Sequence, residues 1–551
     1  MKAAGIRVFS HLLLPLLVSL SPLAVMADEM AVRLQALMTA GQRGELPGVD
    51  IEQWPELQRL YANQNGRLIW SDHRGSPRME RRQQLAAWLG RAYTQGLDPA
   101  AYGGQRMRLV SVKGSPIPVF SSEILLNDLL MSAAFMRLAS DLSGSGIDLA
   151  LIDPLWRLPA KSLDSVALLS RLEQGSSVDQ LLGDLLPRSA EYERLVALHA
   201  KLAQQTRRPY QSLRLPNAVL HPGDRHVDVT VLREGLVRLG LLAPEVDRAD
   251  ELYTPQVADA VRRYQQREGL EVDGIYGPET RALMLLSPVE RRQRVRANLA
   301  RWRALPSALG ERYLLVRTAS YSLDLVEQGQ VVARHAVISG RPQRPSPSFV
   351  AEMNSLTVNP YWNVPFRLAV EDLLPKQQRD ARYFERQGIE VLARQQGQWV
   401  PVDSTTVDWT AVSRRNFHYL LRQRPGPQNS LGKIRFGMAN PYSIFLHDTP
   451  QQSLFARRSR DISSGCIRVR EIDRLAQTLL DDTPLSAALT TDRPRDLMLP
   501  RPLPVYLVYL SVWVDEDRQA YYYPDAYGLD ARMVEFLGPL PVPLGENRDG
   551  P

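Results

Sequence analysis

The N-terminal third of the chain has the hydrophobic spacing of α-helices. Between about residues 49 and 203, apolar residues recur at steps of three and four positions, which places them on one helix face. The clearest stripe lies between Glu123 and Leu138 and contains Leu125, Leu129, Ala133 and Met136. No acid/base pair or metal-ligand spacing stands out in this region. The pattern therefore predicts a packed helical module.

A second helical unit follows a linker that contains proline and arginine, residues 207–223. Thr254 and Pro255 are suited to cap and begin a helix. That helix would present Val257, Ala260, Val261 and Tyr264 on one face and end at Gly269. The loop at residues 272–280 would lead into the next helix, so residues 224–288 are predicted to form a small helical domain.

From about Tyr313 the hydrophobic period changes to two, which indicates β-strands. Alternating segments occupy residues 313–316, 322–326 and 330–338, and Glu327-Gln328-Gly329 separates the last two. We therefore expect a hairpin that leads into a mostly β domain. The apolar run at residues 505–510 predicts further strands beyond residue 500.

A long insertion interrupts this β domain at residues 366–430, with helical patches between Leu368 and Arg382. Long insertions beside an active site often act as lids over bound substrate. A decorative surface loop is the alternative, and the pattern alone leaves both open.

The first 27 residues have the layout of a secretory signal peptide. Lys2 and Arg7 precede an apolar stretch, Leu12 to Met26, of about 15 residues, which is shorter than the roughly 20 that span a membrane. Export to the periplasm is therefore expected, with an uncleaved membrane anchor as the alternative. The composition of the whole chain, 44% hydrophobic and 23% charged, is that of a globular protein.

The formal net charge is +7, but positive and negative residues are interspersed along the chain. No basic run interleaved with aromatic residues stands out, which disfavours nucleic acid as a partner. A mildly basic exported protein suits an anionic cell wall or membrane surface.

The chain contains one cysteine, Cys466, so no intramolecular disulfide can form. A lone thiol in an exported protein is either buried and inert or catalytic. His447 lies nineteen residues earlier, at the end of the β-like run from Tyr442 to Leu446. An imidazole can take the proton of a thiol that attacks an amide and return it to the leaving amine. We therefore expect Cys466 as nucleophile and His447 as its base.

Residues near this pair are candidates for binding the substrate. Gly465 permits a close backbone approach, and the amides near Gly465 and Cys466 are candidate oxyanion donors. Arg468 is suited to hold a carboxylate. Ser463 and Ser464 either contact the substrate or shape the turn. Two aromatic residues either line a groove or simply pack in the interior, namely Phe445 and Trp362.

The stretch around Cys466 resembles the signature of the L,D-transpeptidase catalytic domain. That signature is a strand-end His, a spacer and then [S/T]-x-G-C-[I/V]-R, matched here by His447, Ser463, Gly465, Cys466, Ile467 and Arg468. Ser464 stands where many members have a second His. The likeness extends to residues 301–303, 359–365, 373–376 and 431–433.

The smaller unit resembles the three-helix peptidoglycan-binding domain through Asp273, Gly274 and Gly277 of its D-G-x-x-G-P loop. With both domains, the chain resembles the large multidomain L,D-transpeptidases of Gram-negative bacteria. These likenesses predict a multidomain α+β protein with the following parts: a signal peptide (1–27), a helical scaffold domain (28–210), a three-helix peptidoglycan-binding domain (224–288), a mostly β catalytic domain (300–500, with a lid-like insertion at 366–430), and C-terminal strands and tail (501–551).

The resemblance implies a specific reaction. Members attack the diaminopimelate–D-alanine bond of a tetrapeptide stem, hold the peptide as a thioester and transfer it to an amine, which forms 3-3 cross-links. In this family the third triad member is commonly a backbone carbonyl beside the His, which here falls to Asp448. Expected partners are peptidoglycan stem peptides and glycan, with other wall-synthesis proteins as further candidates. The likeness also implies carbapenem acylation of Cys466, a role in cell shape and no metal or organic cofactor.

Two other activities remain open beside transpeptidation. Water in place of the acceptor amine would give an L,D-carboxypeptidase, and a degenerate site would leave a non-catalytic wall-binding scaffold. A papain-like peptidase is disfavoured, because such enzymes place the Cys early and the His far downstream, whereas here the His precedes the Cys.

Overall fold

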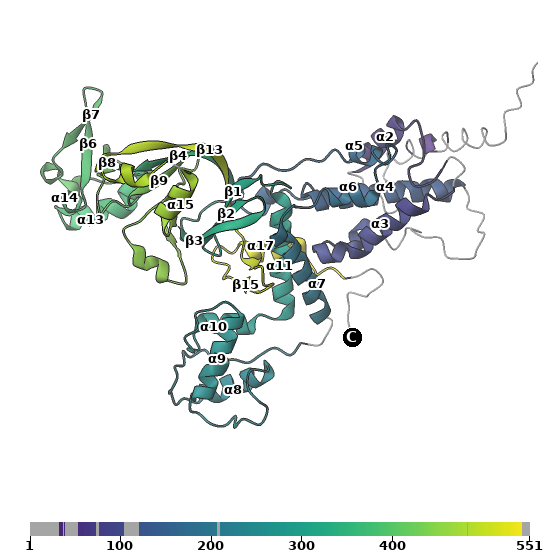
Figure 1. Cartoon of the computed structure of the whole chain (residues 1–551), viewed down its shortest axis with the longest axis horizontal. Helices are drawn as coiled ribbons and strands as arrows, with labels where there is room; N and C mark the ends of the chain where they lie inside the picture. The colour runs from purple at the N-terminus through teal and green to yellow at the C-terminus, as the bar shows by residue number, and fades with distance from the viewer. Residues whose placement is uncertain are drawn as a thin grey trace, which may run out of the picture.

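The computed structural model describes residues 53–72, 76–103, 121–206, 210–481 and 483–542, with single residues between 32 and 38. The expected signal peptide lies outside the described residues. In Figure 1 the N-terminal helices α2 to α6 lie at one end of the long axis, the insertion at residues 366–430 at the other, and the sheet of the β domain between them. Within the described part of the chain, no helix is long and apolar enough to cross a membrane.

The predicted helical scaffold is present. Its helices are α2 (Trp54–Asn63), α3 (Met79–Arg91), α4 (Ser121–Ser143), α5 (Ser165–Ser170), α6 (Val178–Gly183) and α7 (Ala190–Gln205), with short turns η3 (Ala92–Gln95), η4 (Pro99–Tyr102) and η5 (Leu149–Leu151). The fully buried Asp128 of α4 accepts hydrogen bonds from the Ile69 and Trp70 amides and from the Tyr61 hydroxyl. This buried carboxylate therefore ties α2 and its following loop to α4 and has a structural role.

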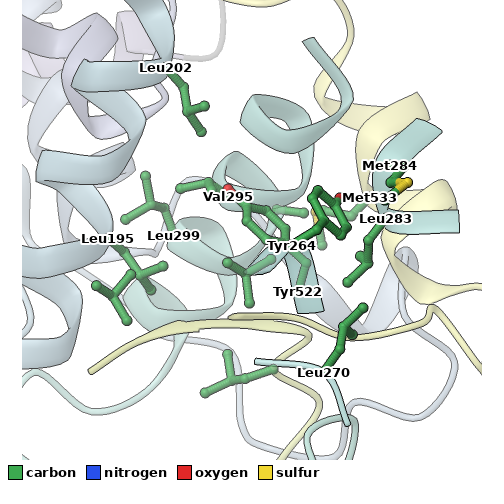
Figure 2. Packing of buried hydrophobic residues seen from close by; sticks show 14 of the residues in the cluster. Leu195, Leu202, Tyr264, Leu270, Leu283, Met284, Val295, Leu299, Tyr522 and Met533 are labelled. Carbon is green, nitrogen blue, oxygen red and sulfur yellow. The ribbon is translucent and has the colours of Figure 1, made fainter. Parts of the chain in front are cut away.

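The three expected helices of the smaller domain are α8 (Asp228–Arg238), α9 (Pro255–Arg267) and α10 (Pro278–Leu285). Thr254 caps α9 by accepting the Val257 amide, as its sequence position predicts. Figure 2 shows Tyr264, Leu270, Leu283 and Met284 of this domain beside Tyr522 and beside Val295 of α11 (Pro288–Ala304). The domain therefore shares a hydrophobic core with α11 and the C-terminal segment.

The β domain is a sheet that closes on itself. Its strands are β1 (Arg312–Arg317), β2 (Ser322–Glu327), β3 (Gln330–Gly340), β4 (Phe349–Val358), β9 (Ile434–Met438), β10 (Leu446–His447), β11 (Asp461–Ser463), β12 (Ile467–Val469) and β13 (Arg495–Val508). The order is β11-β3-β12-β10-β9-β4-β13-β1-β2, and an additional pairing of the last strand, β2, with β3 closes the sheet. This β2–β3 hairpin is the one predicted from the alternating pattern. Helices α15 (Ile472–Leu479) and α16 (Leu485–Leu489) pack against the core of this sheet.

The insertion at residues 366–430 is a folded unit with its own hydrophobic core. The predicted helical patches are α12 (Phe366–Leu368), the π-helical turn η6 (Ala369–Leu373), α13 (Leu374–Arg379) and α14 (Tyr383–Arg386). The sequence analysis missed its sheet, which has the order β5 (Trp362–Asn363), β8 (Tyr419–Gln423), β6 (Ile389–Gln395) and β7 (Gln398–Val402). Two short turns complete it, η7 (Ser404–Thr406) and η8 (Trp409–Ala411).

The boundary expected at residue 500 falls inside β13, which pairs with β1 on one side and β4 on the other. Cutting there would divide a strand in the middle of the sheet, so the β domain extends to Val508. The run at residues 505–510 largely belongs to β13, and the strands beyond it, β14 (Val512–Val514) and β15 (Ala520–Tyr522), form a separate two-stranded sheet rather than extending the β domain. An unpredicted helix, α17 (Leu529–Leu537), follows them.

A buried ion pair fastens α17 to α11. Arg301 lies 2.6 Å from Asp530, both side chains are almost fully buried, and Asp530 also accepts a hydrogen bond from Ser511. Asp530→Ala should lower the free energy of unfolding by about 3–5 kcal/mol, because it strands a buried guanidinium. Urea denaturation followed by tryptophan fluorescence measures this loss.

Glu234→Gln is the matched control, since it breaks the half-exposed Arg248–Glu234 pair and should cost less than about 1 kcal/mol. A loss for Asp530→Ala no larger than that of the control would contradict the structural role of the buried pair.

Candidate active site

The pairing of β10 with β12 brings His447 and Cys466 together. The two strands run parallel, with Leu446 opposite Ile467 and His447 opposite Arg468. The bond from the Ile467 amide to the Phe445 carbonyl extends this ladder by one residue. Side chains alternate along a strand, and Leu446 and Ile467 are fully buried in the barrel core. The side chains on either side of them, Phe445, His447, Cys466 and Arg468, therefore share the opposite face.

His447 is held as a neutral base. Its Nδ1 lies 2.5 Å from the Asp448 carbonyl oxygen, which can only accept a hydrogen bond. Nδ1 therefore carries the ring proton, and Nε2 keeps its lone pair. Burial, reinforced by Arg468 and Arg435, lowers the pKa of His447 to about 3.

The Asp448 carboxylate has a different task. It accepts the Lys433 amide at 2.8 Å and the Gln452 side-chain amide at 3.1 Å. The side chain thus ties neighbouring loops together, while the backbone carbonyl orients the imidazole.

Cys466 rests in its protonated form. Burial raises the pKa of its thiol, while the Phe445 backbone amide and Arg468 act in the opposite direction. The sulfur lies 3.6 Å from the Ser443 carbonyl oxygen, to which it donates a hydrogen bond. Among the described residues, the partner of the thiol is thus Ser443 rather than His447. Nucleophilic attack would require the thiol to turn and give up this proton.

The turn before Cys466 differs from expectation. The Gly465 amide donates to Ser463 Oγ at 3.0 Å, so it is not free to bind an oxyanion. Gly465 instead supplies a backbone with φ of +116°, which other residues rarely adopt. Ser463 is buried and also donates to the Cys466 carbonyl, so it shapes the turn. Within the described part of the chain, the Cys466 amide is left without a hydrogen-bond partner and is the better candidate donor.

The other predicted residues are a polar one, Arg468, and two aromatic ones, Phe445 and Trp362. Arg468 donates to Gln451 Oε1 at 3.0 Å and, among the described residues, has no carboxylate partner. Phe445 is half-buried beneath the Arg435 guanidinium, which lies 5.1 Å from its ring. Trp362 packs against the core of the insertion, in agreement with the packing alternative.

The strand expected from Tyr442 to Leu446 is shorter than predicted, because the Asn440 side chain forms hydrogen bonds with its backbone. Asn440 Oδ1 accepts the amides of Tyr442 and Ile444, and its Nδ2 donates to the Ile444 carbonyl. Such side-chain bonds compete with a strand ladder. The resulting turn holds Ser443 at φ of +54° and directs its carbonyl to the thiol. Only the Asn-Pro pair at residues 440–441 could have signalled this turn.

The segment from Arg344 to Ser348 supports the turn that precedes Cys466, a role that its sequence did not predict. Ser346 Oγ donates to the Gly465 carbonyl at 2.6 Å and accepts the Gly340 amide at 2.9 Å. Arg344 donates to the exposed Ser464 at 3.1 Å. The same buried guanidinium lies 2.6 Å from both Glu371 and Asp372. Arg344 therefore joins the insertion to the turn that carries Cys466.

The D-G-x-x-G-P loop of the small domain builds a turn. Gln265 donates to Asp273 and accepts the Gly274 amide, while Gly277 lies at the N-terminal cap of α10. The residues of the motif therefore have structural roles in this turn and at the start of α10. Within the described ranges, no group of three or more His, Cys, Asp or Glu side chains is arranged to hold a metal ion.

Three family models match separate parts of the chain. Residues 55–198 match a scaffold domain, residues 225–284 a "Putative peptidoglycan binding domain", and residues 311–486 the L,D-transpeptidase catalytic domain. These matches confirm the expected combination of a helical scaffold, a peptidoglycan-binding domain and a β-rich L,D-transpeptidase catalytic domain.

The chain is also similar to individual proteins. A "Putative L,D-transpeptidase" from Haemophilus influenzae is 33% identical over 250 residues, which cover 44% of this chain and 49% of that relative. The chain thus matches about half the length of this relative. An L,D-transpeptidase from Mycobacterium smegmatis has 10% identity, a TM-score of 0.19 and coverage of 36% of this chain and 60% of its own. One from Stackebrandtia nassauensis has 11% identity, a TM-score of 0.19 and coverage of 54% and 97%.

Burial raises the pKa of Cys466, and Arg468 lowers it. Both effects can be tested by alkylation with iodoacetamide, which reacts with the thiolate of the single cysteine. The rate should rise with pH to a midpoint above 9, since burial raises the pKa of Cys466 above its usual 9.0. Arg468→Met should slow alkylation at pH 8 by about three- to tenfold, because the lost cation no longer lowers the pKa of Cys466.

Arg470→Met is the matched control, since Arg470 is exposed and two positions along the same segment. It removes the same charge and should leave the rate within twofold. Equal rates for the two variants would show that Arg468 does not act on the thiol.

Proposed function

We propose that this chain, whose catalytic domain is that of the L,D-transpeptidase family, is an exported peptidoglycan L,D-transpeptidase with Cys466 as its nucleophile. Its donor would be a tetrapeptide stem, cut between diaminopimelate at position three and D-alanine at position four. The acceptor would be the side-chain amine of a second diaminopimelate, which gives a 3-3 cross-link. The observation that carries the proposal is the common face of Cys466 and His447, with His447 Nδ1 bound to a backbone carbonyl.

The reaction begins with proton transfer. His447 Nε2 takes the thiol proton as Sγ attacks the diaminopimelate carbonyl carbon. The low pKa of His447 keeps Nε2 available as an acceptor at neutral pH. The tetrahedral intermediate then expels D-alanine, whose amine receives the proton from His447, and a thioester remains on Cys466.

The second half repeats this chemistry in reverse order. His447 takes a proton from the acceptor amine as its nitrogen attacks the thioester carbonyl, and it returns a proton to the departing thiolate. The Cys466 amide is our candidate for the oxyanion donor in both halves. Arg468, which lacks a carboxylate partner among the described residues, would bind a carboxylate of the stem peptide.

The L,D-carboxypeptidase alternative uses the same thioester and differs only in the second nucleophile. Water would replace the acceptor amine, with D-alanine release unchanged. The non-catalytic scaffold is less well supported, since a binding protein has no need of an imidazole held in one tautomer beside its single thiol.

The proposal predicts product release that depends on Cys466. The purified protein should release D-alanine from disaccharide-tetrapeptides and form cross-linked dimers, both detected by mass spectrometry. Cys466→Ala should abolish both products, because no thioester can form. His447→Gln should lower kcat by about 10²- to 10⁴-fold, the usual contribution of a general base.

Ser453→Ala provides a control, since Ser453 is an exposed residue of η9 (Gln452–Ala456) and its loss should leave turnover unchanged. D-alanine release without dimers would favour the carboxypeptidase. Equal turnover by the protein and its Cys466→Ala variant would rule out Cys466 as the nucleophile.

We further propose that residues 366–430 form a lid whose position depends on Arg344. Glu371 and Asp372 of η6 both bind this guanidinium, and Arg344 in turn contacts Ser464 in the catalytic turn. Glu371 also binds Arg367 and Arg414 of the insertion. The acids therefore link the folded insertion to the turn that precedes Cys466.

Removing the two lid carboxylates should weaken substrate binding. The double variant Glu371→Gln, Asp372→Asn should raise KM for the stem peptide about fivefold, because the insertion loses its charge-assisted bonds to Arg344. Steady-state kinetics on disaccharide-tetrapeptides measures the change, and kcat should change less than KM.

The control is Asp380→Asn, Glu385→Gln, which also removes two acids of the insertion but breaks only pairs with Arg386 and Arg382. If both double variants had the same KM, the link through Arg344 would not control substrate binding.

A further inference from the structure

A cavity of about 300 Å³ separates the small helical domain from the β domain. Its walls are residues 268–271 with Glu279 from the helical domain, residues 456–460 with Tyr321 from the β domain, and residues 521–524 around β15. The volume is at the lower end of the range for ligand pockets. Asp273, Gly274 and Gly277 do not line it, so it is separate from the D-G-x-x-G-P loop.

The walls of this cavity are fixed relative to one another. Tyr522 and the helical domain belong to one hydrophobic core, as Figure 2 shows for Tyr264, Leu270 and Leu283. Gly269 lies so close to Tyr521 that a Cβ there would stand 2.2 Å from its ring. Across the cavity, Glu279 of α10 forms a salt bridge with Arg458. The cavity is therefore part of a docked interface.

The lining chemistry suits a polar, uncharged ligand. Three carboxylates, Glu268, Glu271 and Glu279, line the cavity together with three guanidinium groups, at Arg457, Arg458 and Arg460. Glu279 is paired with Arg458, and Glu268 with Arg291. Burial raises the pKa of Glu279, although Arg458 opposes the shift. Balanced charges disfavour an ionic polymer but supply hydrogen-bond partners for hydroxyl and acetamido groups.

Tyrosine rings provide the apolar part of the lining. Tyr321 and Tyr523 meet edge to face at 6.4 Å, with the Arg460 guanidinium 5.3 Å from the Tyr321 ring. Amphipathic tyrosine rings can pack on the C–H faces of sugars while their hydroxyl groups remain hydrogen-bonded. A saccharide site needs both aromatic rings and polar groups, and this cavity has both.

The cavity also lies a short way along the chain from Cys466. Arg460 in its wall directly precedes β11, which leads to the Ser-Ser-Gly-Cys turn. Cys466 is six positions after Arg460, and even a fully extended segment of that length spans at most about 21 Å. A glycan in the cavity could therefore present a stem peptide, which extends by about 3.5 Å per residue, towards the thiol.

We propose that this cavity binds the glycan strand of peptidoglycan, an N-acetylated amino-sugar polymer, and holds it while its stem peptide reaches Cys466. The proposal rests on the proposed function and adds to it a sugar site shared by the wall-binding and catalytic domains. It implies that the protein favours stems attached to glycan over free peptides.

Binding is tested with the full chain carrying Cys466→Ala, so that no turnover occurs. The probe is an uncharged oligomer of β-1,4-linked N-acetylglucosamine, which has the hydroxyl and acetamido groups of the glycan strand, and calorimetry measures its affinity. Ala456→Trp should fill the cavity, because Ala456 is an exposed lining residue, and should weaken binding at least tenfold. Ala243→Trp, at an exposed position outside the cavity, is the matched control and should bind normally.

Tyr523→Phe gives a milder second variant, which removes one hydroxyl and should weaken binding about two- to fivefold. Equal glycan affinity for Ala456→Trp and Ala243→Trp would overturn the proposal. Loss of affinity only on mutation of the Asp273 loop would also overturn it, since the sugar site would then lie on the helical domain alone.

The kinetic test uses the protein with Cys466 intact. Ala456→Trp should lower kcat/KM for disaccharide-tetrapeptide at least fivefold and leave kcat/KM for free tetrapeptide within twofold. An equal decrease with both substrates would contradict a sugar site. A protein inactive on both would refute the proposed function, whereas the calorimetric result would still decide the sugar site.

Discussion

The parallel pairing of β10 with β12 is the constraint on which the site depends. Closure of the sheet through β2 and β3 leaves these two short strands in the wall of a barrel. Leu446 and Ile467 are drawn into the core, so alternation forces the side chains of His447 and Cys466 onto the same outer face. The hydrophobic effect that fills the barrel therefore also sets which residues meet at the surface.

The electrostatics of the site favour the neutral forms of the His447 imidazole and the Cys466 thiol. His447 is oriented by a backbone carbonyl, so no buried carboxylate stabilises an imidazolium beside the thiol. Arg468 favours the thiolate of Cys466 but disfavours protonation of His447. A resting thiolate–imidazolium pair is thus opposed by burial, and proton transfer is left for the moment of attack, when the substrate can stabilise the new charge.

The sequence predicted those features that depend on residues close together in the chain. Alternation gave the β2–β3 hairpin, and Thr254 gave the start of α9. The motif around Cys466 gave the likeness to the catalytic domain. Contacts between distant segments were not predictable, because nothing near Arg344 in the chain indicates that it lies beside Glu371, Asp372 and Ser464. The bond from the Gly465 amide to Ser463 was not predictable for the same reason, since only the folded turn brings the two groups together.

The most direct test of a nucleophilic Cys466 is to observe the covalent intermediate. The protein is mixed with disaccharide-tetrapeptide without an added acceptor, quenched in acid, and its intact mass and peptide fragments are measured. The account predicts an adduct of the substrate minus D-alanine, located on Cys466 and released by hydroxylamine as a thioester should be. D-alanine release with no adduct on Cys466, or an adduct on another residue, would contradict it.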